Sequence, residues 1–196
     1  MNSAAEKYVE YLQVVDDAAP QLPPMQPVFE QIESILRDAG VPFKHLHHEP
    51  TPTSEDSARV RGEPLAIGGK ALSMRADGRS VLLVLSAARR FNSKRFRKHL
   101  RVKSLRFLSA EELFERTGLV PGSVPPFGAP VLPFELFLDE SLFENDRIAF
   151  NAGSLRDSII LGLLDYVSVV GEYTRVAVAS HPSDDSRVPG ADESQR

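Results

Sequence analysis

The chain has 196 residues, of which 42% are hydrophobic, and it carries a formal net charge of −4 without a single cysteine. This length suits one domain of about 150 residues with tails, and the absent cysteines exclude disulfides, thiolate metal sites and a cysteine nucleophile. No run of about 20 apolar residues is present, and the N-terminus lacks the basic start and apolar centre of a secretory signal. We therefore expect a cytoplasmic protein with no membrane span.

The two ends of the chain differ in composition from its middle. Residues 1–24 combine a short helical stretch with several prolines, which predicts an N-terminal extension or linker. Residues 181–196 are polar and acidic, which predicts a disordered tail. The folded domain is then expected over 25–180. Its first helix is predicted over 28–39 from the helical spacing of apolar residues, and Gly40 ends it.

A histidine-rich segment follows a short predicted strand over 41–47. Three histidines and a glutamate between 45 and 49 invite a metal interpretation, but no further ligand follows at a defined offset, so we expect no metal site. The next residues, 53–56, are typical of a helix N-terminus with Thr53 as the cap, and this helix would run to about Arg61. Free backbone amides at such a terminus also form a modest anion site.

Two strand-like runs, 68–74 and 80–86, flank an Asp-Gly pair and predict a β-hairpin. Lys70 lies in the first strand, on the same face as Leu72. Three interpretations of this lysine stay open: a cation that snorkels to a strand end, an edge charge that hinders aggregation, or a cation in a cleft that meets an anion or a developing oxyanion. The two preceding glycines favour the third, because glycine lets a backbone or ligand approach closely.

A basic segment interrupts the acidic chain, since no acidic residue lies between Asp77 and Glu111. Much of its charge falls on a helix predicted over 94–100 and started by Asn92 or Ser93. A localised basic segment favours contact with a polyanion, and a merely solvated helix face is the alternative.

The second half of the chain alternates short elements. Ser109 and Glu112 form a capping box for a helix that runs to Thr117. The loop over 118–128 is rich in proline and glycine yet contains several apolar side chains, so both a pocket wall and a buried structural turn stay open. Further strands are predicted over 102–108, 131–138, 147–151 and 158–161, a helical turn over 139–146, and a helix over 162–169.

Four segments resemble, in order and spacing, the YbaK/prolyl-tRNA-editing family of aminoacyl-tRNA deacylases. They are 53–55, 68–72, 118–128 and 150–154, and the resemblance extends from about Val28 to Ala179. It implies an α+β fold with a mixed, partly barrel-like β-sheet flanked by helices. It also implies a free-standing enzyme without a cofactor that hydrolyses the ester of a small amino acid mischarged on tRNA, with tRNA-Pro favoured. An aminoacyl-tRNA synthetase is a further implied partner.

The resemblance also assigns roles to residues. It places the main functional role on Lys70 and the aminoacyl pocket under the loop 118–128. The residues expected to bind substrate are Thr53, Ser54, Gly118, Leu119, Pro121, Gly122, Ser123, Val124, Phe127, Gly128, Gly153 and Ser154. The basic segment, rather than a family motif, supplies the residues expected to bind tRNA, which are Arg89, Arg90, Lys94, Arg95, Arg97, Lys98 and Arg101. The chain departs from many relatives at Leu155, where they carry a histidine.

The residues themselves favour attack by water on the ester. The chain has no cysteine and no Gly-x-Ser-x-Gly signature, so a ribose hydroxyl or a substrate side chain is the expected assistant. Lys70 would supply positive charge to the tRNA terminus or to the developing oxyanion, and Leu119, Val124 and Phe127 would set the pocket size. Two alternatives remain: a non-catalytic tRNA- or synthetase-binding module of the same fold, and a hydrolase of another small ester or amide.

Overall fold

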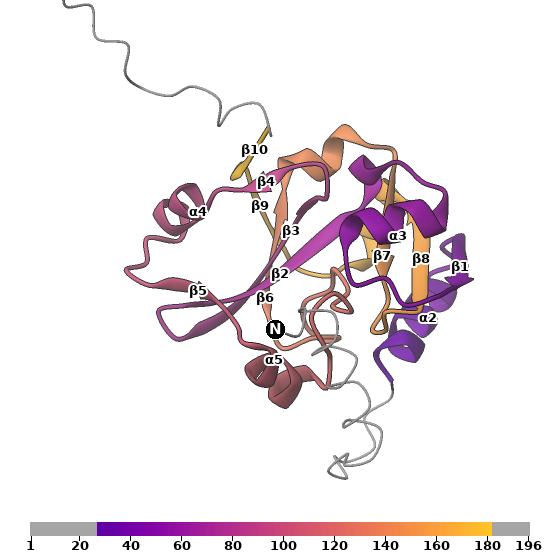
Figure 1. Cartoon of the computed structure of the whole chain (residues 1–196), viewed down its shortest axis with the longest axis horizontal. Helices are drawn as coiled ribbons and strands as arrows, with labels where there is room; N and C mark the ends of the chain where they lie inside the picture. The colour runs from indigo at the N-terminus through magenta and orange to yellow at the C-terminus, as the bar shows by residue number, and fades with distance from the viewer. Residues whose placement is uncertain (1–26, 182–196) are drawn as a thin grey trace, which may run out of the picture.

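The computed structural model describes residues 27–181 (Figure 1). The expected extension over 1–24 and nearly all of the expected tail over 181–196 lie outside the described residues. Between 27 and 181, no helix combines the length and the apolar character needed to cross a membrane.

The largest sheet has five strands in the order β5-β2-β3-β6-β9. Its centre is the predicted hairpin, in which Asp77 and Gly78 take positive φ angles of 45° and 88°, as a tight two-residue turn requires. Strand β6 pairs with β3 and β9 pairs with β6, both in parallel, whereas β5 pairs antiparallel with β2. The bounds are β2 Gly69–Ala76, β3 Arg79–Ser86, β5 Leu105–Phe107, β6 Glu135–Asp139 and β9 Thr174–Val176.

A second, antiparallel sheet has the order β1-β8-β7, and β4 and β10 form a separate pair. An isolated parallel bridge between Gly68 and Ala149 brings the start of β2 against β7. Over residues 27–181 the sheets do not close into a barrel. The bridge between Gly68 and Ala149 is where the two larger sheets meet. The bounds are β1 Phe43–His47, β7 Arg147–Asn151, β8 Asp157–Gly162, β4 Arg90–Phe91 and β10 Ala179–Ser180.

The helices flank the sheets and begin where side-chain caps are available. The side chains of Thr53, Asn92 and Ser109 each accept a hydrogen bond from the backbone three residues on, and the capping box of Ser109 with Glu112 is complete. The α-helices are α2 Val28–Asp38, α3 Ser54–Arg61, α4 Ser93–Leu100, α5 Ala110–Thr117 and α6 Leu163–Val169, and the 3-10 helices are η1 Leu65–Ile67 and η2 Glu140–Glu144.

Two strand predictions needed correction, and three short strands were missed. The apolar run expected as a strand over 131–138 becomes a strand only from Glu135, because residues 131–134 form turns and bends in which Val131, Leu132 and Phe134 are buried. The strand expected over 102–108 shortens to β5. The short strands β4, β9 and β10 were not predicted, since two or three residues carry no periodicity.

The hydrophobic core lies on both faces of the large sheet. On β3, Leu82 and Val84 face one cluster, while Val81, Leu83 and Leu85 face the other. The first cluster fills the space toward the second sheet with α2, α5 and α6, and the second cluster lies beneath α4. A strand that is buried on both faces holds the neighbouring β2, and hence Lys70, in a fixed place.

Candidate active site

A cavity of about 80 Å³ opens where the start of β2 meets the end of β7 and the N-terminus of α3. This space is large enough for several water molecules or a small side chain. Lys70 lines it, together with backbone from both glycines that precede the lysine. The remaining wall combines polar and apolar residues and is formed by Thr51, Pro52, Thr53, Ser54, Ser57, Ala58, Arg61, Glu63, Pro64, Ala87, Gly122, Ala149, Phe150 and Asn151.

Lys70 is half-buried and does not extend into solvent. Its Nζ donates a hydrogen bond of 2.9 Å to the carbonyl oxygen of Arg89, in the segment that links β3 to β4. Burial lowers the pKa of Lys70, and the carboxylate of Glu55 on α3 acts in the opposite direction. This placement matches a cation in a cleft rather than one that snorkels away from the core.

The glycine pair before Lys70 is required by packing. A Cβ on Gly68 would lie 2.9 Å from the Cβ of Ala87, and a Cβ on Gly69 would lie 2.9 Å from Cδ1 of Ile148. The close approach that was expected from a backbone or a ligand is thus made by the side chains of Ala87, in the turn after β3, and Ile148, in β7. These close contacts of Gly68 and Gly69 fix the position of the first residues of β2, and therefore of Lys70 at the cavity.

A buried polar network forms the floor of the cavity. Arg61 donates from Nε to the Oγ of Ser158 at 2.9 Å and from a terminal nitrogen to Oδ1 of Asn151 at 2.6 Å. Ser57 donates to the Oγ1 of Thr51 at 3.0 Å, and Asn151 Nδ2 lies 3.4 Å from that same oxygen. Burial lowers the pKa of Arg61 to about 10, so the guanidinium remains charged at neutral pH.

Residue-by-residue reasoning missed this network. Asn151 lies within the segment 150–154 that resembles the editing family, yet it was not among the expected site residues. Arg61 was recognised only as the end of a helix, and Thr51 and Ser57 gave no signal of their own. The motif around Asn151 was the one available indication of a polar wall.

Some expected substrate-binding residues line the cavity. Thr53 and Ser54 contribute the N-terminus of α3, and Gly122 contributes the loop 118–128, where its φ angle is 89°. Gly122 fits closely here, since a Cβ would lie 3.1 Å from Leu155 and 3.2 Å from the carbonyl oxygen of Pro52.

The other expected substrate-binding residues do not line the cavity. Leu119, Val124 and Phe127 are buried in the hydrophobic core, where the Phe127 ring packs edge-on against Phe150 and Tyr166. The loop therefore turns its apolar side chains inward and offers mainly backbone to the cavity. Outside the cavity wall also lie Gly118, Pro121, Ser123, Gly128, Gly153 and Ser154.

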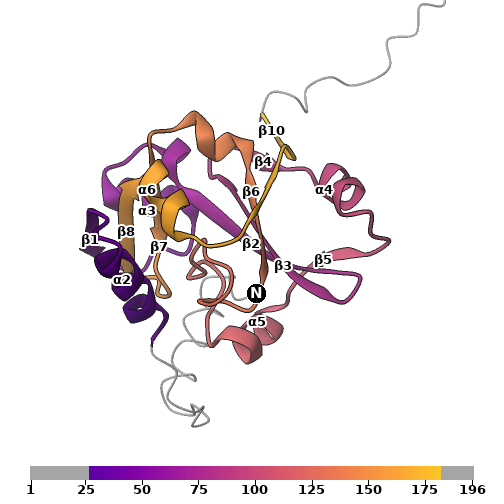
Figure 2. The ribbon, with the colours of Figure 1, turned by 180° about the vertical axis from the view of Figure 1, so that it is seen from behind.

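The basic residues fall into two places. Arg89 adjoins the cavity, but its side chain is only 15% exposed and pairs with Glu144. Both views place α4 on the opposite side of the molecule from α3 (Figures 1 and 2). The exposed basic residues on or beside α4 are Arg90, Lys94, Arg95, Arg97, Lys98 and Arg101.

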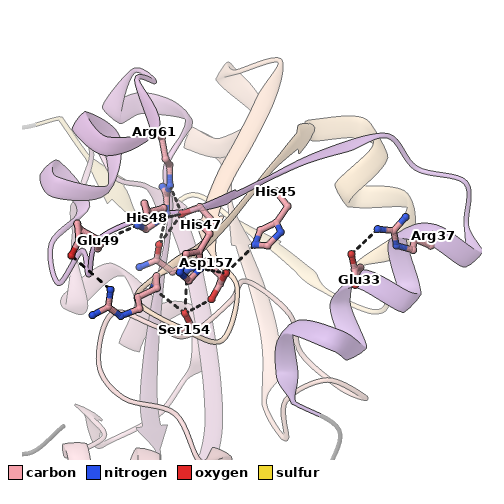
Figure 3. A network of polar contacts seen from close by, with 12 residues as sticks. Glu33, Arg37, His45, His47, His48, Glu49, Arg61, Ser154 and Asp157 are labelled. Atoms are coloured by element: carbon pink, nitrogen blue, oxygen red, sulfur yellow. Dashed lines mark hydrogen bonds and ion pairs between the residues drawn. The ribbon is translucent and has the colours of Figure 1, made fainter. Parts of the chain in front are cut away.

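The histidine-rich strand β1 forms a second polar cluster (Figure 3). His45 Nε2 and His47 Nδ1 both lie 2.9 Å from Oδ1 of Asp157, and Ser154 donates to its Oδ2 at 2.7 Å. Burial raises the pKa of Asp157, but the hydrogen bonds outweigh it and lower the pKa to about 2. Among residues 27–181, no three His, Cys, Asp or Glu side chains are arranged to hold a metal ion.

Comparison with known proteins agrees with this architecture. The sequence profile described as the aminoacyl-tRNA editing domain matches residues 48–169, which include the cavity wall. The chain belongs to the aminoacyl-tRNA editing domain family. The resemblance noted in the four sequence segments is thereby confirmed.

Several relatives define this membership further. The chain is 34% identical over 146 residues, 71% of its length and 86% of the relative, to the Escherichia coli K12 protein named multifunctional Ser/Thr-tRNA deacylase ProXp-y. It is 35% identical over 115 residues to a proline–tRNA ligase of Bacillus licheniformis, covering 56% of this chain and 20% of the ligase. A crystal structure of a candidate trans-editing enzyme for prolyl tRNA synthetase superposes with a TM-score of 0.66 at 21% identity, over 80% of this chain and 99% of that one, which confirms the mixed α+β fold.

Proposed function

We propose that this chain is a trans-editing aminoacyl-tRNA deacylase, which hydrolyses the ester between a mischarged amino acid and the 3′ end of tRNA. The observation that carries the proposal is Lys70, a half-buried cation on the wall of a small cavity that also holds several hydroxyl and amide groups. Membership of the editing family and the name of the Escherichia coli relative support the same reaction class.

The proposed reaction is a direct hydrolysis. The oxygen of a water molecule bonds to the ester carbonyl carbon, the bond to the ribose oxygen breaks, and that oxygen takes a proton from the water. The released carboxyl group loses its proton to solvent. Negative charge develops on the carbonyl oxygen during attack, and Lys70 would stabilise it at the cavity wall. Backbone amides at the start of α3, near Ser54, would add partial positive charge.

The cavity wall favours a small hydroxylated side chain as substrate. Its volume of about 80 Å³ excludes large side chains, and hydroxyl and amide groups of Thr51, Ser57 and Asn151 contribute to it. A site that hydrogen-bonds a substrate hydroxyl discriminates against an analogue without it far more strongly than an apolar wall discriminates by size. We therefore infer that seryl and threonyl esters are better substrates than alanyl esters, which agrees with the name of the Escherichia coli relative.

The identity of the tRNA and of any protein partner stays a prediction. The similarity to part of a proline–tRNA ligase supports tRNA-Pro and a synthetase as candidates. The exposed cations of α4 would bind the tRNA backbone at a distance from the cavity.

One assay tests the proposal. Wild-type protein and the Lys70→Ala variant are incubated with labelled alanyl-, seryl-, cysteinyl- and threonyl-tRNA, and released amino acid is measured. We expect release by the wild type, with a loss of about 10²–10³-fold in rate for Lys70→Ala. Lys44→Ala is the matched control, because Lys44 is exposed on β1 and absent from the cavity wall.

The alternatives give different results in the same assay. Binding of tRNA without release of amino acid would support a non-catalytic module of the same fold. Neither binding nor release would point to a hydrolase of another small ester or amide. Equal rates for wild type and Lys70→Ala would refute the role given to this lysine.

A further inference from the structure

The side-chain amide of Asn151 joins the loop 118–128 to the cavity floor, beside a backbone hydrogen bond from Gly153 to the carbonyl oxygen of Ser123. Its Nδ2 donates to the carbonyl oxygen of Gly122 at 2.9 Å, and Gly122 is the residue of this loop that lines the cavity. The Gly153 bond holds the next carbonyl of the loop, so the orientation of the Gly122 carbonyl itself depends on which way the Asn151 amide points.

Arg61 fixes the direction of this amide. Oδ1 of Asn151 accepts from the Arg61 guanidinium at 2.6 Å and from Ser158 Oγ at 3.2 Å. A flipped amide would aim Nδ2 at these donors and Oδ1 at the Gly122 carbonyl, so both sides would become repulsive. A charged donor makes this preference stronger than a neutral one would, because charge-assisted hydrogen bonds are roughly twice as strong.

The guanidinium is also an unusual choice for a purely structural position. Arg61 is 9% exposed, and it forms no ion pair with any residue of the described range 27–181. Burial of a charge among neutral partners is unfavourable. Its two hydrogen bonds, one from Nε and one from a terminal nitrogen, come from the planar fork that distinguishes arginine from lysine.

We propose that Arg61 is a positioning residue of the active site, which acts through Asn151 to hold the Gly122 peptide against the cavity. The inference rests on the proposed deacylase function for its effect on rate, but its structural part is independent of that function. Arg61 would not contact the reacting atoms. Its contribution is to keep the polar wall in the arrangement that meets the substrate.

The test compares Arg61→Ala and Asn151→Asp with the control Arg59→Ala, whose side chain is exposed on the same helix. We expect Arg61→Ala to lower kcat by about 10- to 100-fold with a much smaller change in KM, as for loss of one or two charged hydrogen bonds. Added methylguanidinium should restore part of the lost rate. Amide hydrogen exchange should accelerate within residues 118–124.

Asn151→Asp keeps the fold testable if Arg61→Ala does not fold. An aspartate retains the partnership with Arg61 but presents an oxygen, rather than a donor, to the Gly122 carbonyl. We expect this variant to remain folded, because its carboxylate forms an ion pair with Arg61, and yet to lose activity and to exchange faster in the loop, because the oxygen repels the Gly122 carbonyl. Wild-type kcat together with wild-type loop exchange in Asn151→Asp would overturn the proposal.

The proposed deacylase function and the positioning role of Arg61 can be refuted separately. If wild-type protein releases no amino acid from any of the charged tRNAs, the proposed function falls. Faster loop exchange in the Arg61 and Asn151 variants would still support the positioning role. Unchanged exchange in both variants would refute that role whatever the activity.

Discussion

Replacing Gly69 by alanine tests whether the glycines before Lys70 serve packing or ligand approach. The added Cβ would lie 2.9 Å from Cδ1 and 3.1 Å from Cγ1 of Ile148. Ile148 is fully buried in β7, so its side chain has no solvent space into which to move. Overpacking of this kind costs about 1–3 kcal/mol, and we expect a loss of this size in the free energy of unfolding.

A double-mutant cycle identifies the contact. Ile148→Val deletes Cδ1, the atom nearest to the added Cβ, and should alone cost about 0.5–1.5 kcal/mol. If the clash is the cause, the double variant will be less destabilised than the sum of the single variants, by about 0.5 kcal/mol or more. Urea unfolding with a constant m-value gives the four free energies.

Two results would refute this reasoning. Additive free energies would show that residue 69 and Ile148 do not meet as the structure places them. A Gly69→Ala protein of unchanged stability that no longer releases amino acid would show that the glycine serves the ligand instead. The neighbouring Gly68→Ala should be harder to relieve, because its Cβ would also lie 3.1 Å from the backbone oxygen of Leu65.

Three further predictions concern the rest of the molecule. The pKa of Asp157, about 2, lies below the value of about 3.9 for an unfolded aspartate. The interactions of this carboxylate therefore stabilise the fold above about pH 4, and that stabilisation is lost as pH falls toward 2. Asp157→Asn should flatten the dependence of the unfolding free energy on pH between these values, as measured by urea unfolding. Lys98→Glu on α4 should weaken tRNA binding and reduce the slope of log affinity against log salt by about 0.7–0.9 or more, and an unchanged slope in filter binding would contradict the assignment. Phe96→Ala should lower the free energy of unfolding by about 3–5 kcal/mol, because the ring is fully buried with its centroid 5.2 Å from that of Phe137. A smaller loss in urea unfolding would mean that α4 shifts to fill the cavity left by the ring.

Sequence reasoning succeeded where the determining interactions are local. The caps Thr53, Asn92 and Ser109 each act on a backbone amide three residues away, so the pattern that predicts the helix contains the whole interaction. The hairpin turn is equally local, since Asp77 and Gly78 alone adopt the required backbone angles. The capped helices and the central hairpin follow from such signals.

Sequence reasoning failed where it had to decide which part of the structure covers a buried side chain. The apolar side chains of Leu119, Val124 and Phe127 indicated a buried loop, but composition does not tell whether the covered face belongs to a pocket or to the core. The hydrogen bond between Arg61 and Asn151 joins residues 90 positions apart, and neither local sequence contains its partner. The partners within the polar wall of the cavity were therefore visible only in the folded chain.

The charges around the cavity give the proposed substrate an orientation. Lys70 and Arg61 line the wall as cations, while Glu63, the carboxylate on the same wall, is held in a bidentate pair with Arg147. An aminoacyl ester presents a cationic ammonium group and an electron-rich carbonyl oxygen. Repulsion between like charges in a half-buried site disfavours the ammonium next to Lys70, and attraction favours the carbonyl there. In the proposed reaction, Lys70 would thus face the oxygen on which charge develops during hydrolysis.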